Sequence, residues 1–449
     1  MPDTALLSGW GRTAPSRSTV AQPKDGAALR ALLDAGVPGL IPRGLGRSYG
    51  DAAQCGGGTV VELRHLSRIG NLDEDAGAIE VEAGASLDAV MRHTLGRGWF
   101  PPVTPGTRQV TIGGALAADV HGKNHHRDGS ICRHVTELTL ETPEGTHVVA
   151  PDRDAELFWA TAGGMGLTGV ITRATLRLLP VETDQMVVDT DRFEDLDAVM
   201  AAMEEGDHRY RYSVAWVDCT AGGRRAGRAV LTRGDHARRE DVPLRRVGRR
   251  PPGIQDGHLG VPEGLPAHLL NGLTIRAFNE AWYRRAPRRR HGELQPLGRF
   301  FHPLDGVADW NRLYGPGGFV QYQFAVGPGQ GEVVRQAVAL LSARRLPSFL
   351  AVLKRFGPGD PGPLSFPMAG WTLALDLPVG PPALPASLDE LDGVVAAAGG
   401  RVYLAKDARL RPELLATMYP RLPELAAVRR RVDPAGTLRS DLSRRLGID

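Results

Sequence analysis

A glycine-rich stretch, PRGLGRSYGD at residues 42–51, is the first part of the sequence whose residue types can hold a ligand. Gly44, Gly46 and Gly50 allow positive φ angles, at which successive N–H groups can converge on phosphate oxygens. A dinucleotide fingerprint needs G-x-G-x-x-G at a turn from a strand into a helix. Here the spacing is G-x-G-x-x-x-G, and a further loop and a strand follow. The stretch therefore predicts a phosphate-binding loop outside the Rossmann class, and an NAD-dependent dehydrogenase is the least favoured function.

A second stretch, VTPGTRQVTIGGALAADVHGKNHHRDGS at residues 103–130, has the same character. Gly106, Gly113, Gly114 and Gly122 punctuate it, and small uncharged residues surround them. One loop of this kind could be an ordinary turn. Two of them indicate backbone packed closely against a long, flat cofactor that carries phosphate.

The elements that must position these loops follow from hydrophobic periodicity and turn residues. We predict a helix over 25–37, a strand over 58–66 and a strand–turn–helix unit over 77–98 with Ser86 as the helix N-cap. A hairpin over 135–151 and a helix–turn–strand unit over 154–180 complete a mixed α and β domain that ends near residue 183.

Longer strands dominate the next part of the chain. We predict strands at 212–219, 317–326, 348–357 and 371–379, with helices at 331–345 and 386–400 between them, which indicates a second α+β domain on a broad sheet. Residues 236–295 are dense in Pro, Gly and Arg and show little periodicity, so we expect a partly mobile segment that could act as a lid. After residue 401 we predict a strand end and two helices.

The polar residues of one predicted strand suit a sugar. Gln321 and Gln323 alternate with Tyr322, so the two amides share one face of the sheet and can hold hydroxyl groups. The alternative is that they are ordinary polar residues of an edge strand.

The bulk composition is that of an ordinary soluble protein, with 42% hydrophobic and 23% charged residues in a chain of 449. No apolar run is long enough to span a bilayer, and the N-terminus lacks the pattern of a standard signal peptide. The three cysteines, Cys55, Cys132 and Cys219, are widely spaced. They indicate a reducing compartment without disulfides or a metal site, and predict a cytoplasmic location.

The net charge of +3 does not by itself indicate nucleic acid. Arginines cluster in two stretches, for which the alternatives are a solvated surface or a patch that contacts anionic lipid headgroups or an anionic substrate. Nucleic-acid binding is disfavoured because no aromatic residues or binding motif accompany the arginines. The clustered arginines are Arg238, Arg239, Arg245, Arg246, Arg249, Arg250, Arg284, Arg285, Arg288, Arg289 and Arg290.

Several motifs, spread over essentially the whole chain, carry a family resemblance. They are PRGLGRSYGD, PGTRQVTIGGALAADVHGKNHH, ELFWATAGGMGLTG, QYQF, LKRFGP, YLAKD and RRRVDP. Together they resemble the vanillyl-alcohol-oxidase-type FAD flavoproteins, and within them the oxidases of polyprenylphosphoryl ribose. The resemblance implies an α+β fold with a PCMH-type FAD domain over 1–183, a substrate domain with an antiparallel sheet over 184–400, and a C-terminal segment over 401–449 that completes the FAD domain.

The resemblance also implies which residues bind FAD. The first loop would wrap the pyrophosphate, with Pro42, Arg43, Gly44, Leu45, Gly46, Arg47, Ser48, Tyr49, Gly50, Asp51 and Ala52. The adenosine and flavin would be lined by Gly106, Thr111, Ile112, Gly113, Gly114, His121, Gly122, Lys123, Asn124, Ile171 and Tyr403.

One position in the first loop bears on how the cofactor is attached. Many relatives carry a histidine there, which tethers the flavin covalently, whereas this chain has Arg47. A guanidinium cannot form that bond, so we expect FAD bound non-covalently. His121 is then the main local histidine, either packed as a structural residue or positioning groups near the flavin.

The catalytic residues that the resemblance implies are Lys406, Tyr49 and His121. Lys406 would stabilise the reduced cofactor, with a surface ion pair to Asp407 as the alternative. Tyr49 would accept a proton or position the substrate hydroxyl. The substrate would be bound by Gln321, Gln323, Lys354, Thr372 and Asp376.

The implied function is oxidation of the 2′-hydroxyl of a polyprenylphosphoryl-β-D-ribose to a ketone. This is the first half of an epimerisation to the arabinose donor of cell-wall arabinan, which a separate short-chain reductase would complete. The chain departs from relatives with this activity at Thr372, where they carry asparagine, and at Ala374, where they carry cysteine. The alternatives are therefore the same chemistry on another sugar or alditol, and a flavin-binding protein without turnover.

Overall fold

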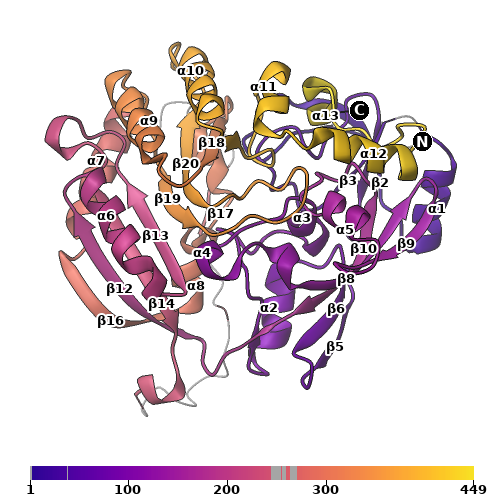
Figure 1. Ribbon diagram of the computed structural model, residues 1–449, viewed down its shortest axis with the longest axis horizontal. Coiled ribbons are helices and arrows are strands. Elements are labelled where there is room, and N and C mark those ends of the chain that lie inside the picture. Colours follow the sequence, from indigo (N-terminus) through magenta and orange to yellow (C-terminus); the bar gives the residue numbers. More distant parts are fainter. Residues whose placement is uncertain (1–2, 38, 244–253, 255–258, 263–269, 449) are drawn as a thin grey trace.

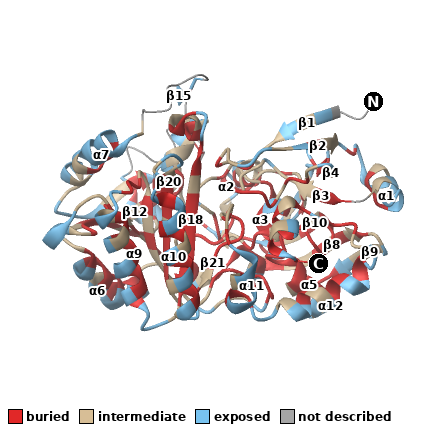
Figure 2. Cartoon of the chain, turned by 90° about the horizontal axis from the view of Figure 1, so that it is seen from above, coloured by how far each residue is buried: buried red, intermediate tan, exposed pale blue. Residues whose placement is uncertain are grey.

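A computed structural model describes residues 3–37, 39–243, 254, 259–262 and 270–448. The chain forms two halves, and Figure 1 shows the N- and C-termini together in one of them. Buried residues fill the interior of both halves, while exposed residues lie on the outer faces of the covering helices (Figure 2).

The half that contains the termini is built on two sheets. One has the order β1(Asp3–Leu7)-β2(Ser16–Ala21)-β4(Thr59–Glu62)-β3(Leu40–Arg43), in which β2, β4 and β3 are parallel. The other is antiparallel, with the order β5(Ile69–Asp73)-β6(Ala78–Glu82)-β10(Val170–Arg177)-β8(Val135–Thr142)-β9(Gly145–Val149). A small pair joins β11(Leu179–Pro180) to β7(Trp99–Phe100).

The elements predicted for this half are confirmed. Helix α1 spans Gly26–Asp34, α2 spans Leu87–Leu95 and α5 spans Ala155–Thr161. The Ser86 side chain accepts a hydrogen bond from the backbone N–H of Ala89, as expected of an N-cap. The short helices α3(Ile112–Ala117), α4(His125–Asp128) and η1(Ile131–His134) follow the second glycine-rich stretch.

The other half is built on one eight-stranded antiparallel sheet. Its order is β16(Arg289–Pro296)-β12(Gln185–Phe193)-β14(Ala229–His236)-β13(Tyr212–Val217)-β19(Ala351–Phe356)-β20(Gly370–Pro378)-β18(Phe319–Val326)-β21(Arg401–Val402). Helices α6(Leu196–Gly206), α9(Gly331–Ala343) and α10(Leu384–Ala397) pack on this sheet, and Figure 1 shows them on its outer side. The four strands and two helices predicted for this half are confirmed, and β18 is an interior strand rather than an edge.

Register places the polar residues of this sheet together. Gln321 pairs with Asp376, Gln323 pairs with Ala374, and Lys354 pairs with Thr372. Because side chains alternate along each strand, the amides of β18 and the lysine of β19 reach the same face as residue 374 of β20. That face is turned toward the other half.

Regular elements also occur inside the stretch 236–295, where the sequence predicted a candidate lid. They are η4(Arg239–Asp241), β15(Leu259–Gly260), α7(Gly272–Arg285) and most of β16, followed by α8(Leu297–Phe301), η5(Pro303–Gly306), β17(Val307–Ala308) and η6(Trp310–Tyr314). Helix α7 was not predicted, because the surrounding Pro, Gly and Arg obscure its periodicity. Residues 244–253, 255–258 and 263–269 of the predicted lid lie outside the described part of the chain. The remaining short helices, η2(Asp207–Arg209) and η3(Gly223–Arg225), connect strands of the large sheet.

The C-terminal segment returns to the half where the chain began. Helices α11(Pro412–Met418) and α12(Leu422–Val432) confirm the two predicted helices, and α13(Asp441–Leu446) is an additional one. Helix α12 packs against α5, and Leu438 forms a parallel bridge with Leu40 of β3. The six residues of α13 are too few to show a helical period, which is why the sequence did not predict it.

Candidate active site

A cavity of about 540 Å³ lies between the two halves. One wall consists of the two glycine-rich loops, and the opposite wall is the inner face of β18, β19 and β20. Both groups of residues singled out in the sequence therefore meet in one space. The predicted residues that line it are Pro42, Arg43, Gly44, Leu45, Gly46, Arg47, Ser48, Tyr49, Ala52, Gly106, Thr111, Gly113, Gly114, His121, Ile171, Gln321, Gln323, Lys354, Tyr403 and Lys406.

The first glycine loop leaves β3 with its backbone exposed to this cavity. Gly46 has a φ of 66°, which glycine adopts without strain. A Cβ on Gly44 would lie 2.2 Å from Thr111 Oγ1, so no larger residue fits there. The backbone N–H groups of residues 45–48 donate to no acceptor within the described chain. Unpaired consecutive amides beside a cavity can donate hydrogen bonds to phosphate oxygens.

Other predicted residues of the loops support the cavity from behind. Arg43 donates to the carbonyl oxygens of Ser8 and Ala53, so its guanidinium holds the loop to its neighbours. A Cβ on Gly113 would lie 2.8 Å from that of Ala83, so helix α3 can pack this closely only because residue 113 is glycine. The predicted cofactor residues outside the lining are Gly50, Asp51, Ile112, Gly122, Lys123 and Asn124.

These outlying residues have other partners. Asn124 donates to the carbonyl of Pro102 and to Asp128. The Lys123 ammonium donates to the carbonyl of Phe300, and burial lowers the pKa of Lys123 to about 7. Ile112 is fully buried in the core.

His121 joins the two walls of the cavity. Its Nε2 lies 3.0 Å from Gln323 Nε2, and its Nδ1 lies 3.0 Å from Lys354 Nζ. Burial, and next the charge of Lys354, hold the pKa of His121 well below its usual value, so the ring is neutral. Burial also lowers the pKa of Lys354 to about 7. The imidazole therefore contacts one amide of β18 and one amine of β19.

Lys406 and Tyr49 form the second cluster of polar groups. Lys406 Nζ lies 3.7 Å from the centre of the Tyr49 ring, a cation–π contact. Burial lowers the pKa of Lys406 to about 7, and Asp376 opposes that shift. The pKa of Tyr49 is raised well above its usual value by burial, and next by the charge of Asp376, so the phenol keeps its proton. Gln321 donates to Asp376 across the two strands.

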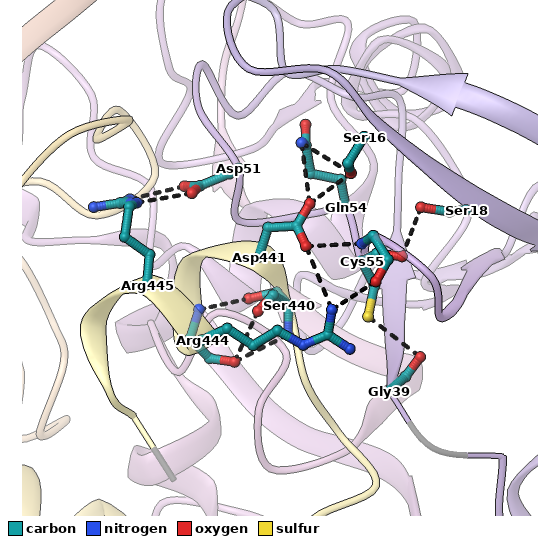
Figure 3. Close-up of polar contacts among 12 residues, drawn as sticks. Ser16, Ser18, Gly39, Asp51, Gln54, Cys55, Ser440, Asp441, Arg444 and Arg445 are labelled. Atoms are coloured by element: carbon teal, nitrogen blue, oxygen red, sulfur yellow. Dashed lines mark hydrogen bonds and ion pairs between the residues drawn. The ribbon is translucent and has the colours of Figure 1, made fainter.

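The alternative ion pair between Lys406 and Asp407 does not form. Asp407 instead accepts a hydrogen bond from Arg445 at 2.8 Å, and the same guanidinium makes two bonds of 2.8 Å to Asp51. Figure 3 shows Arg445 reaching from α13 to the first glycine loop. Tyr49 N–H also donates to the carbonyl of Ala405. Through Arg445, the C-terminal helix therefore holds the first glycine loop and the turn that carries Lys406 at a fixed position relative to each other.

Thr372 and Asp376 are buried in the sheet and lie outside the lining, whereas Ala374 lines the cavity. The Thr372 hydroxyl accepts from Gln323 and donates to the carbonyl of Phe324. Of the two positions that the sequence analysis singled out, residue 374 therefore forms part of the wall itself, and residue 372 supports Gln323.

Part of the lining was not predicted from the sequence. Trp10 and Trp310 lie at the same cavity with ring centres 5.9 Å apart, and Arg47 lies over the Trp10 ring at 4.0 Å. Met165 and Arg108 also line it. No spacing rule connects residue 10 with residue 310, so only the fold brings them together.

The fold and this cavity define an FAD-dependent oxidoreductase, because residues 19–150 match the family model of the FAD binding domain. The chain belongs to the decaprenylphosphoryl-β-D-ribose oxidase family. It is 42% identical over 453 residues to the decaprenylphosphoryl-β-D-ribose oxidase of Mycolicibacterium smegmatis, an alignment that covers 99% of this chain and 98% of that protein.

Other relatives align with part of the chain. An uncharacterized protein of Streptomyces coelicolor, in the mprA 5′ region, is 45% identical over 374 residues, which cover 81% of this chain and all of that protein. Cytokinin dehydrogenase 7 of Oryza sativa is 37% identical over 146 residues, which cover 31% of this chain and 28% of that enzyme. Within the described residues, no helix has the length and apolar character that crossing a membrane requires.

The described residues fit FAD. The amides of residues 45–48 suit its pyrophosphate, and the close packing at Gly44 and Gly113 leaves bare backbone along one wall. Lys406 and Lys354 place their side-chain nitrogen atoms on the opposite wall of the cavity. The expectation of an FAD site is therefore met by the geometry of the cavity as well as by the family model.

Proposed function

We propose that this protein oxidises the 2′-hydroxyl of a polyprenylphosphoryl-β-D-ribose to a ketone, the reaction type that the name of its full-length relative indicates. The observation that carries the proposal is the single cavity in which the glycine loop faces Gln321, Gln323 and Lys354. Two side-chain amides and an amine are suited to hydroxyl groups.

FAD, when bound, supplies the hydride acceptor for such a reaction. The protonated Tyr49 and the Lys406 nitrogen orient the substrate hydroxyl, and cationic Lys406 stabilises the negative charge that hydride transfer brings into the cavity. We assign the hydroxyl proton to the amine of Lys354, because its pKa of about 7 allows it to be neutral before the reaction and charged afterwards. Because Gln323 donates to His121 Nε2, the neutral imidazole carries its proton on Nδ1 and donates it to the neutral amine of Lys354 before the reaction.

The test of this proposal is the position of the reacting hydrogen. Holoenzyme is given polyprenylphosphoryl ribose with deuterium at C2′, or with deuterium at C3′ as the matched control. Slower turnover of the C2′ form alone supports the proposal, whereas an isotope effect only at C3′ contradicts it.

A second candidate is the same oxidation of another sugar or an alditol. Ala374 favours it, because it presents a small apolar side chain to the cavity wall at a position where the family resemblance implies cysteine. Turnover of a free alditol faster than of the lipid-linked ribose would select this candidate.

Arg47 of the first glycine loop leads to a prediction about how the cofactor is attached. We propose that FAD is bound non-covalently, because the Arg47 guanidinium is engaged with Trp10 and with the carbonyl of Leu45 and offers no nucleophile. Acid precipitation of the yellow protein should leave all flavin in the supernatant. Colour that stays with the washed pellet would contradict this proposal.

The two buried lysines predict a pH profile. Lys354 must be neutral, so activity should rise as the pH increases through its pKa of about 7. Lys406 must be cationic, so activity should fall as the pH increases through its own pKa of about 7. Plots of kcat/KM against pH should therefore be bell-shaped with a maximum near pH 7. In the variant Lys406→Arg, kcat/KM should no longer fall at high pH, because arginine stays charged. A fall of kcat/KM at high pH that persists in this variant would exclude Lys406 as its source.

We further propose two partners. A separate short-chain reductase would consume the ketone, and the arginine-rich stretches would contact anionic lipid around the substrate. Sedimentation with vesicles tests the second point, since equal recovery with neutral and anionic vesicles would rule it out.

A further inference from the structure

Three aromatic side chains connect the cavity wall to the protein surface. Phe349 directly precedes Leu350, which lines the cavity, and packs against the buried cluster of Trp310, Tyr314 and Phe319. The ring centres of Phe349 and Phe278 are 4.7 Å apart, and those of Phe278 and Trp282 are 6.0 Å apart. We call Phe349, Phe278 and Trp282 the aromatic strip.

The outer part of this strip is open to solvent. Phe278 is 39% exposed and Trp282 is 46% exposed, although both rings are large and apolar. They lie on one flank of α7, beside Ile275 and Asn279, which face the interior. Scattered apolar residues on a surface are ordinary, but a contiguous run that leads out of a ligand cavity indicates a binding site.

The size of the cavity explains why an apolar exit is needed. The cavity, of about 540 Å³, must hold both the cofactor and a sugar. A long isoprenoid chain attached to that sugar cannot fit inside as well. Its carbons would gain most by leaving along apolar side chains, because burial of apolar surface is favourable.

We infer that the aromatic strip binds the isoprenoid chain of the substrate next to its phosphate. The inference rests on the proposed function, because only a lipid-linked substrate has such a chain. It adds an apolar binding site on α7, of which the sequence analysis considered only the terminal Arg284 and Arg285, as part of an arginine cluster.

The test measures binding of the chain without any oxidation. Holoenzyme is titrated by calorimetry with a long-chain polyprenyl phosphate that lacks the sugar, held below its aggregation limit, and with butyl phosphate. The double variant Phe278→Ser/Trp282→Ser should raise Kd for the long-chain phosphate about tenfold, the loss expected for about one large apolar side chain. Its Kd for butyl phosphate should be unchanged.

Two further variants decide between explanations. Leu273→Ser is the matched control, because Leu273 is 80% exposed on the same helix and lies outside the strip. An equal loss of affinity for the long-chain phosphate in this variant would indicate general contact of α7 with lipid and would overturn the inference. Phe278→Leu/Trp282→Leu should recover most of the affinity. An unchanged Kd in the serine double variant, with wild-type FAD content and melting temperature, would also overturn it.

Failure of the proposed function would look different. In that case butylphosphoryl ribose would not reduce the bound flavin of the wild-type protein, whatever the calorimetry shows. Normal flavin reduction together with no effect of the strip variants would instead reject the aromatic strip alone.

Discussion

Lys406→Met is expected to lower kcat by roughly 100- to 1000-fold while FAD stays bound, the range for removing one preorganised electrostatic group from an active site. Methionine keeps the unbranched shape beside the Tyr49 ring but carries no charge. Hydride transfer moves negative charge from the substrate to its acceptor, and Lys406 lies in the cavity wall without an ion pair to Asp407. Single-turnover reduction of the flavin, followed by its absorbance, measures the effect.

Two control variants make this result specific. Lys24→Met makes the same change at an exposed lysine outside the cavity lining and should leave kcat within about twofold. Lys406→Arg keeps the charge and should lose less activity than the methionine variant. A Lys406→Met protein with full FAD content and near-normal kcat would show that another group performs this role.

Arg445→Ala is expected to reduce the free energy of unfolding by about 3 kcal/mol, because it takes a shared cation away from two buried carboxylates. Asp51 and Asp407 are both more than nine-tenths buried, and each accepts from this guanidinium at 2.8 Å. Since these acids anchor the glycine loop and the Lys406 turn, FAD should also be lost on dilution.

The neighbouring residue provides the matched control. Arg444 bonds the carbonyl of Gly56 and pairs with Asp441 at 3.7 Å, and its side chain is 41% exposed. Arg444→Ala should therefore cost less than about 1 kcal/mol and keep FAD. Chemical unfolding, together with flavin fluorescence released on dilution, measures both variants; equal behaviour of Arg444→Ala and Arg445→Ala would refute the role assigned to the C-terminal helix.

Local patterns predicted the parts of this protein that depend on local physics. Alternation in the segment that forms β18 placed Gln321 and Gln323 on one face, and the bare glycine backbone of residues 44–46 indicated a phosphate loop. Both features depend on neighbours within a few residues, so spacing alone reveals them.

Features that depend on distant contacts could not be predicted in this way. Arg445 meets Asp51 across nearly 400 residues of sequence, at 394 positions of separation, and α13 is too short to show a period. The neutral state of His121 follows from burial and from Lys354 on another strand. Helix α7 was hidden among Pro, Gly and Arg, although its Asn271 N-cap, whose side chain accepts from two backbone N–H groups, is a local signal that was overlooked.

Anaerobic titration of the purified yellow protein tests the central claim most directly. Polyprenylphosphoryl ribose should bleach the flavin absorbance stoichiometrically, while the corresponding 2′-deoxyribose lipid should leave it unchanged, because it lacks the hydroxyl that we propose is oxidised. Equal bleaching by both lipids, or none by either in protein that is fully loaded with FAD, would contradict the assignment of this cavity as the site of 2′-oxidation.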